Sequence, residues 1–493
     1  MGKVMLIGAG PGDAQLLTVK GLAALQKADV IVYDRLVEPA MLQERKASCK
    51  LIYVGKEPLH HPIPQDEIEQ ILVKEAATNE LVVRLKAGDP YVFGRGGEEG
   101  ETLYKAGIPF EVIPGITSAI GGLAYAGIPV THRDFASSFH VITGHLKKGR
   151  DPLDWEALAR LEGTLVFLMG MTNLPNICAN LLENGRKAET GVAIVQWASR
   201  GKQLTVTGNL QNIEQKVAES GISSPALIVV GDVVSLRPQL NFFEEMPLFH
   251  TKVLLPRARA GKSMLAEQIR DLGGEVTMYP NIQVLDVVPT KTKEELSEVS
   301  ELLFTSKEAV ERFFDYLAQL DLDIRSLKNT HLTAIGKQTK EAFSEKGIIP
   351  DSFIKRRSTE LILEHLPRLQ ENASNLIIGS IVDTAEVNAI LAEVEAMEMM
   401  PLYDMRPVTE RPFDLASFEQ VCFSSSRSVQ NLLDVLTTEE KAILQTKTIL
   451  SIGRFTSATL ASFGINHFIE AESATPESLI ELIQKTKLEG VPQ

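Results

Sequence analysis

The stretch Ile7–Asp13 reads IGAGPGD and directly follows the apolar run VML, Val4–Leu6. An apolar strand that enters a glycine turn is typical of the first unit of an α/β domain, and such a turn often holds a dinucleotide. Asp34 ends the run DVIVYD about twenty residues later. There, the acidic residue of a nicotinamide-dependent dehydrogenase would bind a ribose hydroxyl, so a dehydrogenase is one interpretation of this turn.

The turn departs from the dinucleotide pattern in two ways. Glycines at positions 8, 10 and 12 give G-x-G-x-G, and Asp13 stands where the third glycine belongs. Pro11 removes a backbone N–H from a loop that would have to donate such groups to a pyrophosphate. Taken alone, the turn is better explained as a strand-to-helix connection with Asp13 as the N-cap of the next helix.

Further glycine-rich segments follow later apolar runs and change that interpretation. They are RLKAGDPYVFGRGGEE (84–99), IPGITSAIGGLAYAGIPVTHRD (113–134), VITGH (141–145) and FLMGM (167–171). Small residues in several loops allow a ligand to lie close to the backbone, and these loops lack the lysine signature of a phosphate-binding loop. The pattern therefore indicates a ligand site built from several strand ends.

Length and composition bound the class of protein. A chain of 493 residues is too long for one hydrophobic core, which predicts two or three domains. Its 44% hydrophobic and 23% charged residues are typical of globular proteins, and no apolar run is long enough to cross a membrane. The start VMLIGAG indicates a buried strand and not a signal peptide, so we expect a cytoplasmic protein.

Charge and cysteine content argue against several functions. A net charge of −14 argues against nucleic acid as a partner, so an anionic substrate must be held by local groups of Arg and Lys. The distant cysteines Cys49, Cys178 and Cys422 indicate neither a disulfide framework nor a metal site.

The organisation along the chain predicts an α/β fold. Up to about residue 236, short β-branched runs alternate with amphipathic stretches. We expect two subdomains there, about 1–115 and 116–240, and an aperiodic linker at 241–250. A new strand opens at KVLLPRA, residues 252–258.

The C-terminal part contains an internal repeat. LLFTSKEAVERFF from Leu302 is echoed by VCFSSSRSVQNLL from Val421, and AIGKQTKEAFSEKGI from Ala334 is echoed by SIGRFTSATLASFGI from Ser451. Two copies predict two similar lobes with a ligand cleft between them.

The first 240 residues resemble the uroporphyrinogen-III C-methyltransferases of the tetrapyrrole methylase family. The motifs that carry the resemblance are GAGPGD (8–13), LLTVKG (16–21), ADVIVYDRLV (28–37), VGK (54–56), RLKAGDPYVFGRGGEE (84–99), PGITSA (114–119), GIPVTHRD (127–134) and TGH (143–145). The resemblance implies S-adenosyl-L-methionine as methyl donor, with S-adenosyl-L-homocysteine as product. It also implies that the opening turn belongs to the donor site.

The resemblance implies which residues line that donor site. They are Pro11, Ala87, Gly88, Asp89, Val92, Thr117, Ser118, Met169 and Ala198. Ala87 stands where the family more often has glycine, and Met169 alone is as well explained as a core side chain after an apolar strand. Loops lined by backbone suit methyl transfer from a sulfonium, which requires donor and acceptor at near-attack distance.

The resemblance also implies a catalytic set. Asp34 and Lys56 match the positions that the family assigns as proton acceptor and proton donor, and a carboxylate near an ammonium can share proton transfer on a pyrrole. From the residues alone, they are a strand-end cap and a surface lysine. Arg95 and Glu98 complete the set, with Arg95 either gripping a substrate carboxylate or pairing with Glu98 on the surface.

The implied substrate, uroporphyrinogen, carries acetate and propionate arms, so cations must hold it locally. Candidates are Arg84, Lys86, Arg95, His132, Arg133, His145 and Lys147 in the first half, and Arg257, Arg259, Lys262, Lys337, Arg427 and Arg454 in the second.

Residues from about 250 onward resemble the uroporphyrinogen-III synthases, through VLLPRA (253–258) and the paired strands and turns of the repeat. The resemblance implies interleaved lobes, one of residues 251–283 with 407–493 and one of residues 284–406. It implies closure of hydroxymethylbilane with inversion of the last pyrrole, through a stabilised cation that needs shape and electrostatics more than a nucleophile. The hydroxyls of Thr305, Ser306, Thr339, Ser424, Ser425 and Thr456 are either cleft hydrogen-bonding groups or helix N-caps.

Together the resemblances imply a bifunctional enzyme, because the synthase's product is the methyltransferase's substrate. It would make uroporphyrinogen III and methylate it twice to precorrin-2, for sirohaem or cobalamin, as a homodimer. The alternative is a C-terminal tetrapyrrole-binding or regulatory module. It is favoured by the stretch LIIGSIVDTAEVNAIL, which we expect to open the second copy at Leu376 and which has no counterpart of Arg257 and Arg259.

Overall fold

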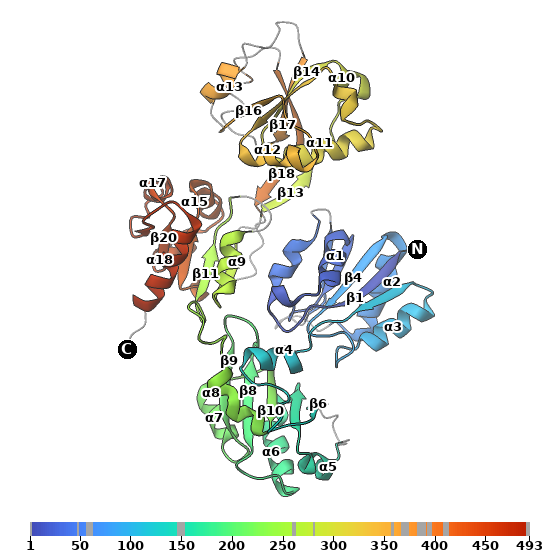
Figure 1. Ribbon diagram of the computed structural model, residues 1–493, viewed down its shortest axis with the longest axis vertical. Coiled ribbons are helices and arrows are strands. Elements are labelled where there is room, and N and C mark those ends of the chain that lie inside the picture. The colour runs from blue at the N-terminus through green and yellow to red at the C-terminus, as the bar shows by residue number, and fades with distance from the viewer. Residues whose placement is uncertain are drawn as a thin grey trace. The chain divides into compact units, whose positions relative to one another are not determined.

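The computed structural model describes residues 2–46, 49–55, 63–144, 153–258, 263–279, 282–355, 359–365, 374–381, 391, 397–407 and 414–489. The chain divides into two compact units, one of residues 1–279 and 411–493 and the other of residues 280–410 (Figure 1). Within the described ranges, the first unit contains three five-stranded sheets and the second contains a six-stranded sheet. Among these residues no helix has the length and apolar character needed to cross a bilayer.

The first sheet is entirely parallel, in the order β3-β2-β4-β1-β5. Its strands are β1 (Lys3–Gly8), β2 (Val30–Tyr33), β3 (Lys50–Tyr53), β4 (Leu81–Lys86) and β5 (Phe110–Ile113). One face is covered by α1 (Val19–Lys27) and the other by α2 (Gln65–Thr78) and α3 (Gly96–Lys105). Because the strands are parallel and covered on both faces, they are continuous apolar runs whose following loops meet at one edge.

The helix after the opening turn begins later than expected. Asp13 caps only the short 3-10 helix Ala14–Leu16, by accepting a hydrogen bond from Gln15 N. Helix α1 starts after Thr18, whose Oγ1 accepts a hydrogen bond from Gly21 N. The prediction that Asp13 caps the whole helix is wrong, because the backbone is extended at Leu17.

The second sheet is mixed, in the order β6-β7-β10-β8-β9, with only the pair β6–β7 parallel among its described pairs. Its strands are β6 (Phe139–Thr143), β7 (Thr164–Leu168), β8 (Gly191–Gln196), β9 (Leu204–Asn209) and β10 (Ala226–Val230). Helix α4 (Ser118–Tyr125) packs on one face, and α5 (Trp155–Arg160), α6 (Leu174–Glu183) and α7 (Ile213–Ser220) pack on the other.

Residues 241–250 follow helix α8 (Arg237–Leu240) without a helix or strand. The ring of Phe243 lies 4.8 Å from that of Tyr125, and Glu244 accepts a hydrogen bond from Gln203 Nε2 at 2.9 Å. Leu248 is fully buried in the core of the third sheet. This segment is therefore packed along its length and is not a free tether.

The last two sheets share one strand order, which confirms the internal repeat. The third sheet runs β12-β11-β19-β20-β21, and the fourth runs β18-β17-β14-β15-β16 with β13 added beyond β18. The strands of the third are β11 (Lys252–Leu255), β12 (Glu275–Met278), β19 (Gln420–Phe423), β20 (Thr448–Ser451) and β21 (Ile469–Glu470). Those of the fourth are β13 (Ile282–Asp286), β14 (Val299–Phe304), β15 (His331–Ile335), β16 (Ser352–Ile354), β17 (Ser374–Ser380) and β18 (Met397–Pro407).

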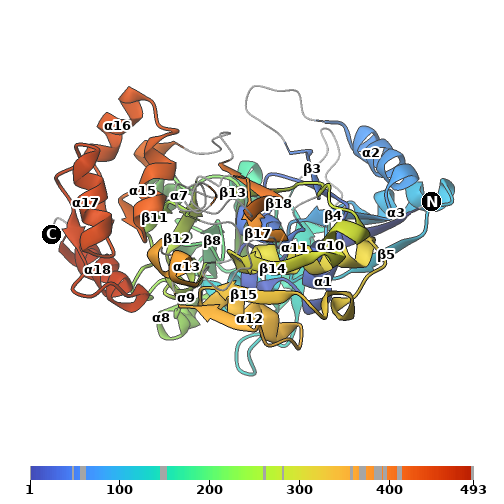
Figure 2. The same ribbon diagram turned by 90° about the horizontal axis from the view of Figure 1, so that it is seen from above.

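Helices cover both faces of these two sheets. Around the third sheet, α9 (Met264–Asp271) and α18 (Pro476–Glu489) pack on one face, and α15 (Ser426–Leu433), α16 (Thr438–Gln445) and α17 (Arg454–Ser462) on the other (Figure 2). In the fourth, α10 (Lys293–Ser297), α11 (Lys307–Gln319) and α12 (Lys337–Glu345) contact the larger core and α13 (Thr359–His365) the smaller.

The stretch at Leu376 does not open the second copy of the repeat. It lies in β17 and pairs with β14 of the first copy, Leu376 opposite Leu302. In the third sheet the equivalent place beside β19 belongs to β11, which comes much earlier in the chain. The expectation is wrong because pairing in space, and not sequence order, decides which strand completes each sheet. The strand beside β14 is β17, which follows it in the chain, whereas the strand beside β19 is β11, which precedes it.

Candidate active site

A pocket of about 1160 Å³ lies where loops of the first sheet meet the second sheet. It is lined by residues that follow β1, β4 and β5 of the first sheet and β7 and β8 of the second. The structure brings together in it all nine predicted donor-site residues: Pro11, Ala87, Gly88, Asp89, Val92, Thr117, Ser118, Met169 and Ala198. Five segments that are far apart in sequence therefore meet at one place.

Backbone contacts hold the opening turn against the loop after β4. Gly10 N donates to Gly88 O at 3.1 Å, and Gly88 N donates to Gly10 O at 2.7 Å. Both glycines have positive φ, +78° and +68°, a conformation that costs other residues about 1–2 kcal/mol. The G-x-G pattern thus serves a reciprocal backbone pair.

Two further glycines allow these loops to touch. A Cβ on Gly8 would lie 2.5 Å from Gly115 Cα, and a Cβ on Gly115 would lie 2.3 Å from Gly88 O. Neither position tolerates a side chain without movement of backbone. The pocket floor is therefore built from three strand-end loops in direct backbone contact.

Asp89 and Thr117 fix the loops that they belong to. Asp89 accepts hydrogen bonds from Tyr91 N at 2.8 Å and from Gly115 N at 3.0 Å, so its carboxylate ties the loop after β4 to the loop after β5. Thr117 is the N-cap of α4 and accepts from Ala119 N at 3.4 Å. The start of α4 is thereby directed at the pocket.

Three large side chains that line the pocket belong to residues whose backbone is in a strained conformation. Phe93, Met169 and Trp197 have φ values of +53°, +57° and +48°, and such strain concentrates at functional sites. Met169 is 53% exposed, so its explanation as a core side chain is wrong. Phe93 and Trp197 were missed by sequence reasoning, because backbone strain leaves no mark in residue type.

Asp34 lies directly after β2, beside the pocket-lining residue Leu36. Its Oδ1 accepts from Leu36 N at 3.2 Å, and its Oδ2 lies 3.6 Å from Arg84 Nη2. Its side chain is 29% exposed. Lys56, the predicted proton donor, lies outside the described residues.

Arg84 and Lys86 do not lie where cations could hold a substrate. They are 3% and 4% exposed, and both donate to Glu99 Oε1, at 3.2 and 2.8 Å. Glu99 was missed by sequence reasoning, although the buried face of α3 that carries it also holds Gly96, Gly100 and Leu103. The prediction that these two cations attract the substrate is wrong, because β4 places them under α3.

Arg95 and Glu98 pair with each other on the surface. Arg95 Nη2 lies 2.5 Å from Glu98 Oε2, and the two side chains are 54% and 53% exposed. This hydrogen bond lowers the pKa of Glu98 and raises that of Arg95. Neither residue lines the pocket, so the geometry matches the surface ion pair and not a grip on substrate.

Arg200 is a further pocket residue that the sequence did not single out. It is bound by Leu36 O, which accepts from Nη2 at 2.7 Å, and by Glu38 at 3.2 Å. Its guanidinium and the ammonium of Lys202 lie over the ring of Trp197, at 5.0 and 4.1 Å from the centroid. These contacts bring positive charge to one wall of the pocket.

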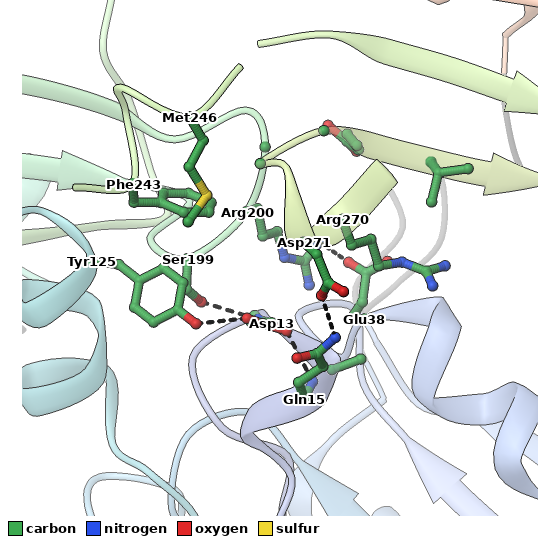
Figure 3. Close-up of a pocket in the computed structure, with 17 residues that line it drawn as sticks. Asp13, Gln15, Glu38, Tyr125, Ser199, Arg200, Phe243, Met246, Arg270 and Asp271 are labelled. Atoms are coloured by element: carbon green, nitrogen blue, oxygen red, sulfur yellow. Dashed lines mark hydrogen bonds and ion pairs between the residues drawn. The ribbon is translucent and has the colours of Figure 1, made fainter. Parts of the chain in front are cut away.

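A second pocket of about 790 Å³ within the first unit lies beside the opening turn (Figure 3). In it Asp13 N donates to Ser199 Oγ at 3.0 Å, and Tyr125 OH donates to Asp13 Oδ2 at 2.6 Å. Burial and this carboxylate raise the pKa of Tyr125. Asp13, at the position of the missing third glycine, therefore anchors the turn, and it is not among the residues that line the first pocket.

The remaining candidate cations lie apart from the pocket residues or outside the described ranges. His145, Lys147, Arg259 and Lys262 lie outside the described residues. Lys337 lies 3.6 Å from Glu341 on the exposed face of α12, and Arg454 lies over the ring of Phe455. Each of these two contacts is local to its own helix.

The hydroxyls of the repeat mostly satisfy backbone groups. Ser306 and Ser425 are the N-caps of α11 and α15. Thr305 Oγ1 donates to Ile378 O at 3.1 Å, and Thr339 Oγ1 donates to Ile335 O at 2.6 Å. The N-cap interpretation holds for Ser306 and Ser425, whereas Thr305 and Thr339 donate to backbone carbonyls and are N-caps of neither α11 nor α12.

Comparison with known families matches both halves of the chain. The model of tetrapyrrole (corrin/porphyrin) methylases matches residues 3–214, and that of uroporphyrinogen-III synthase HemD matches residues 263–481. These matches favour the methylase interpretation of the opening turn over a dehydrogenase.

Similar proteins cover between about half and nearly all of the chain. Porphyrin biosynthesis protein HemD of Ruminiclostridium josui is 37% identical over 497 residues, 97% of each chain. Uroporphyrinogen-III C-methyltransferase of Bacillus subtilis (strain 168) is 44% identical over 71% of this chain and 74% of its own. Siroheme synthase of Pseudoalteromonas atlantica is 54% identical over 49% of this chain and 52% of its own.

Among solved structures, uroporphyrin-III C-methyltransferase of Thermus thermophilus complexed with S-adenyl homocysteine is 41% identical. The match covers 48% of this chain and 100% of that one, with a TM-score of 0.41. On the family models and the relatives that span most of its length, the chain belongs to the tetrapyrrole methylase family in its N-terminal half and to the uroporphyrinogen-III synthase family in its C-terminal half.

Proposed function

We propose that the chain converts hydroxymethylbilane to precorrin-2 in two reactions. The C-terminal half closes hydroxymethylbilane to uroporphyrinogen III, and the N-terminal half transfers two methyl groups to that product from S-adenosyl-L-methionine. The observation that carries the proposal is the convergence of all nine predicted donor-site residues on one pocket. Membership of both families supports the pairing of the two reactions.

The pocket fits a methyl donor by its construction. Its floor is backbone with no room for a Cβ at Gly8 or Gly115, so a ligand lies against loops that cannot shift independently. Gly10, Gly88, Asp89 and Met169, which line the pocket, would hold the donor. When bound, S-adenosylmethionine supplies a methyl group on a positively charged sulfur. The protein's task is to orient donor and acceptor and to exclude water.

Asp34 is proposed as the proton acceptor. Its carboxylate is partly exposed and accepts a hydrogen bond from the backbone N–H of Leu36, a residue that lines the pocket, while Arg84 lies 3.6 Å away and helps to fix its orientation. Methyl transfer breaks the sulfur–methyl bond and makes the substituted pyrrole carbon quaternary, which leaves a cationic product. A carboxylate held in this way accepts the proton that this product then loses from a neighbouring position of the macrocycle, without having to rotate. Lys56 is proposed as the proton donor by its family position alone. Arg95 and Glu98, which pair with each other on the surface, are proposed as members of the catalytic set on the same ground.

The grouping of strands into four sheets supports a proposal for the domain limits. We propose a methyltransferase at 1–240, with subdomains divided near residue 115, and a synthase at 251–493. Its lobes are 251–283 with 407–493 and 284–406, joined to the methyltransferase by the packed segment 241–250. The identical strand order of the third and fourth sheets supports two lobes of common origin.

We further propose a cytoplasmic homodimer that serves sirohaem or cobalamin synthesis. Three buried free thiols support a reducing compartment. Exposed apolar side chains of the methyltransferase half, such as Ile120 and Phe139, support association through that half. Light scattering on the purified chain measures the oligomeric state, and a monomer at micromolar concentration contradicts it.

The decisive experiment supplies the intact chain with hydroxymethylbilane and S-adenosylmethionine without oxygen, and follows products by absorbance and mass. A doubly methylated dihydro product is the expected result. Uroporphyrinogen I, formed by spontaneous closure, would show that the C-terminal half is inactive or regulatory. The methyltransferase is then assayed separately by giving the same chain uroporphyrinogen III, and a lack of methyl transfer there contradicts the first half of the proposal.

A further inference from the structure

Asp34 belongs to a cluster of four charged side chains, of which the other three are buried. Arg84 Nε and Lys86 Nζ both donate to Glu99 Oε1, at 3.2 and 2.8 Å, and Arg84 Nη2 lies 3.6 Å from Asp34 Oδ2. The side chains of Arg84, Lys86 and Glu99 are 4%, 6% and 0% exposed. Asp34 is the one member of this cluster that reaches solvent to any large extent.

Glu99 sets the orientation of Arg84. Its Oε1 also accepts from Gln65 Nε2 at 3.3 Å, so three donors converge on one oxygen. Within the described residues its Oε2 is buried and has no hydrogen-bond partner. Because Glu99 binds the Nε of Arg84, the guanidinium is turned with Nη2 toward Asp34 and Nη1 toward Val32 O and Leu85 O.

This arrangement is costly for a purely structural element. Burying ions costs several kcal/mol each before pairing, and apolar side chains of similar volume often stabilise a core as well or better. The rest of the buried face of α3 is Gly96, Gly100 and Leu103, so an apolar residue at position 99 would suit the packing. Burial and the nearby Arg84 also lower the pKa of Lys86, which shows how far the cluster is from water.

We infer that Glu99 is a positioning residue for methyl transfer, acting through Arg84 to hold the Asp34 carboxylate in one fixed orientation. The inference rests on the proposed role of Asp34 as proton acceptor. Arg84 makes both contacts at once because β4 pairs with β2, which ends just before Asp34, and because Arg84 is on the face of β4 that α3 covers. Loss of the Glu99 charge frees the guanidinium to turn, and the carboxylate then loses its fixed direction.

The test compares two matched substitutions in the full chain. Glu99→Gln keeps the shape of the side chain and removes its charge. Glu75→Gln does the same to another buried glutamate of a helix, which pairs with Lys50 at 2.7 Å. Lys50 is the first residue of β3, opposite Val30 of β2. That pair therefore lies at the amino end of the strands, whereas Asp34 follows the carboxyl end of β2.

Methyl transfer to uroporphyrinogen III is measured with labelled donor. We expect Glu99→Gln to lower kcat by about tenfold to a hundredfold, the range for a misplaced catalytic group, with the KM for S-adenosylmethionine unchanged. Glu75→Gln should lose thermal stability and keep kcat. Because Glu99 acts through Asp34, the double variant Asp34→Asn with Glu99→Gln should be no slower than Asp34→Asn alone.

The inference is overturned if Glu99→Gln keeps the wild-type kcat, if its loss multiplies with that of Asp34→Asn, or if Asp34→Asn itself is fully active. If wild-type protein transfers no methyl group, the proposed function fails and takes the inference with it. Should Glu99→Gln fail to fold, Lys86→Met with Glu99→Gln removes one cation and one anion together, and its kcat is judged by the same criteria.

Discussion

Single side chains, and in places their absence, decide the geometry of the pocket. Gly8, Gly88 and Gly115 allow three loops to meet backbone to backbone, and Asp89 bonds across two of them. The glycines of the opening turn are therefore required for close contact between loops, and not for binding a phosphate group. Substitutions at these positions test the pocket without touching charged groups.

Gly115→Ala should disrupt the pocket floor. The added Cβ would lie 2.3 Å from Gly88 O, so backbone must move. We expect a loss of stability of about 1–3 kcal/mol, as for overpacked sites, and weaker binding of S-adenosylmethionine in calorimetric titration. Gly97→Ala is the control, since its Cβ meets nothing within 4 Å. Equal donor affinity in both variants would contradict the assignment.

Met169 offers a test of stored backbone strain. Its φ of +57° is unfavourable for any residue with a Cβ. Met169→Ala and Met169→Gly both remove the side chain from the pocket and should weaken donor binding alike. Only glycine relieves the strain, so the glycine variant should be more stable than the alanine variant by about 1 kcal/mol in urea unfolding. The reverse order would show that no strain is held there.

Helices and strands position these residues through contacts between elements. Lys3 of β1 and Lys20 of α1 both pair with Glu111 of β5, which ties the opening strand and helix to the strand that leads to Gly115. The two lysines lower the pKa of Glu111 from 4.5 to about 2. These charges lie at the amino ends of the strands, away from the pocket.

The Glu111 cluster gives a defined pH dependence. Because the folded pKa is lowered, its stabilising contribution is present above pH 4.5 and is lost as the pH falls toward 2. Glu111→Gln lacks this contribution at every pH. The wild type should therefore have the higher Tm at pH 7, and the difference should shrink between pH 4.5 and 2. A difference that stays constant with pH would contradict the pairing.

The two compact units of the chain differ in their cysteine content. All three cysteines lie in the unit of residues 1–279 and 411–493, where each is buried. Burial raises the pKa of Cys49 to about 11 and that of Cys178 to about 12, so their thiolates are rare in the folded state. Thiol chemistry therefore reports on this unit alone.

Unfolding of the two units should be separable. We expect denaturant to give more than one transition by circular dichroism, because residues 280–410 form a compact unit with their own cores. A thiol reagent should label three cysteines only in the transition of the first unit. Labelling in every transition, or a single transition at all wavelengths, would show that the units unfold together.

The sequence predicted the fold class and the repeat because these leave local marks, since strands covered on both faces are apolar runs. The residues of the donor pocket came from the family resemblance: parallel strands place the loops of Pro11, Gly88 and Thr117 at one edge, but Met169 follows β7 of another sheet. The sequence did not predict that β17 completes the first copy of the repeat, since strand pairing is decided in space.

Charge pairing was beyond the sequence for a physical reason. Periodicity indicates which face of an element is buried but not which side chain meets it from another element. The sequence thus assigns Arg84 and Lys86 to the substrate, whereas α3 brings Glu99 onto both of them. The anchoring of Asp13 by Tyr125, 112 residues away, was equally invisible. The residue types and the order of strands are thus properties of the sequence, and the partners of its charged groups are properties of the folded chain.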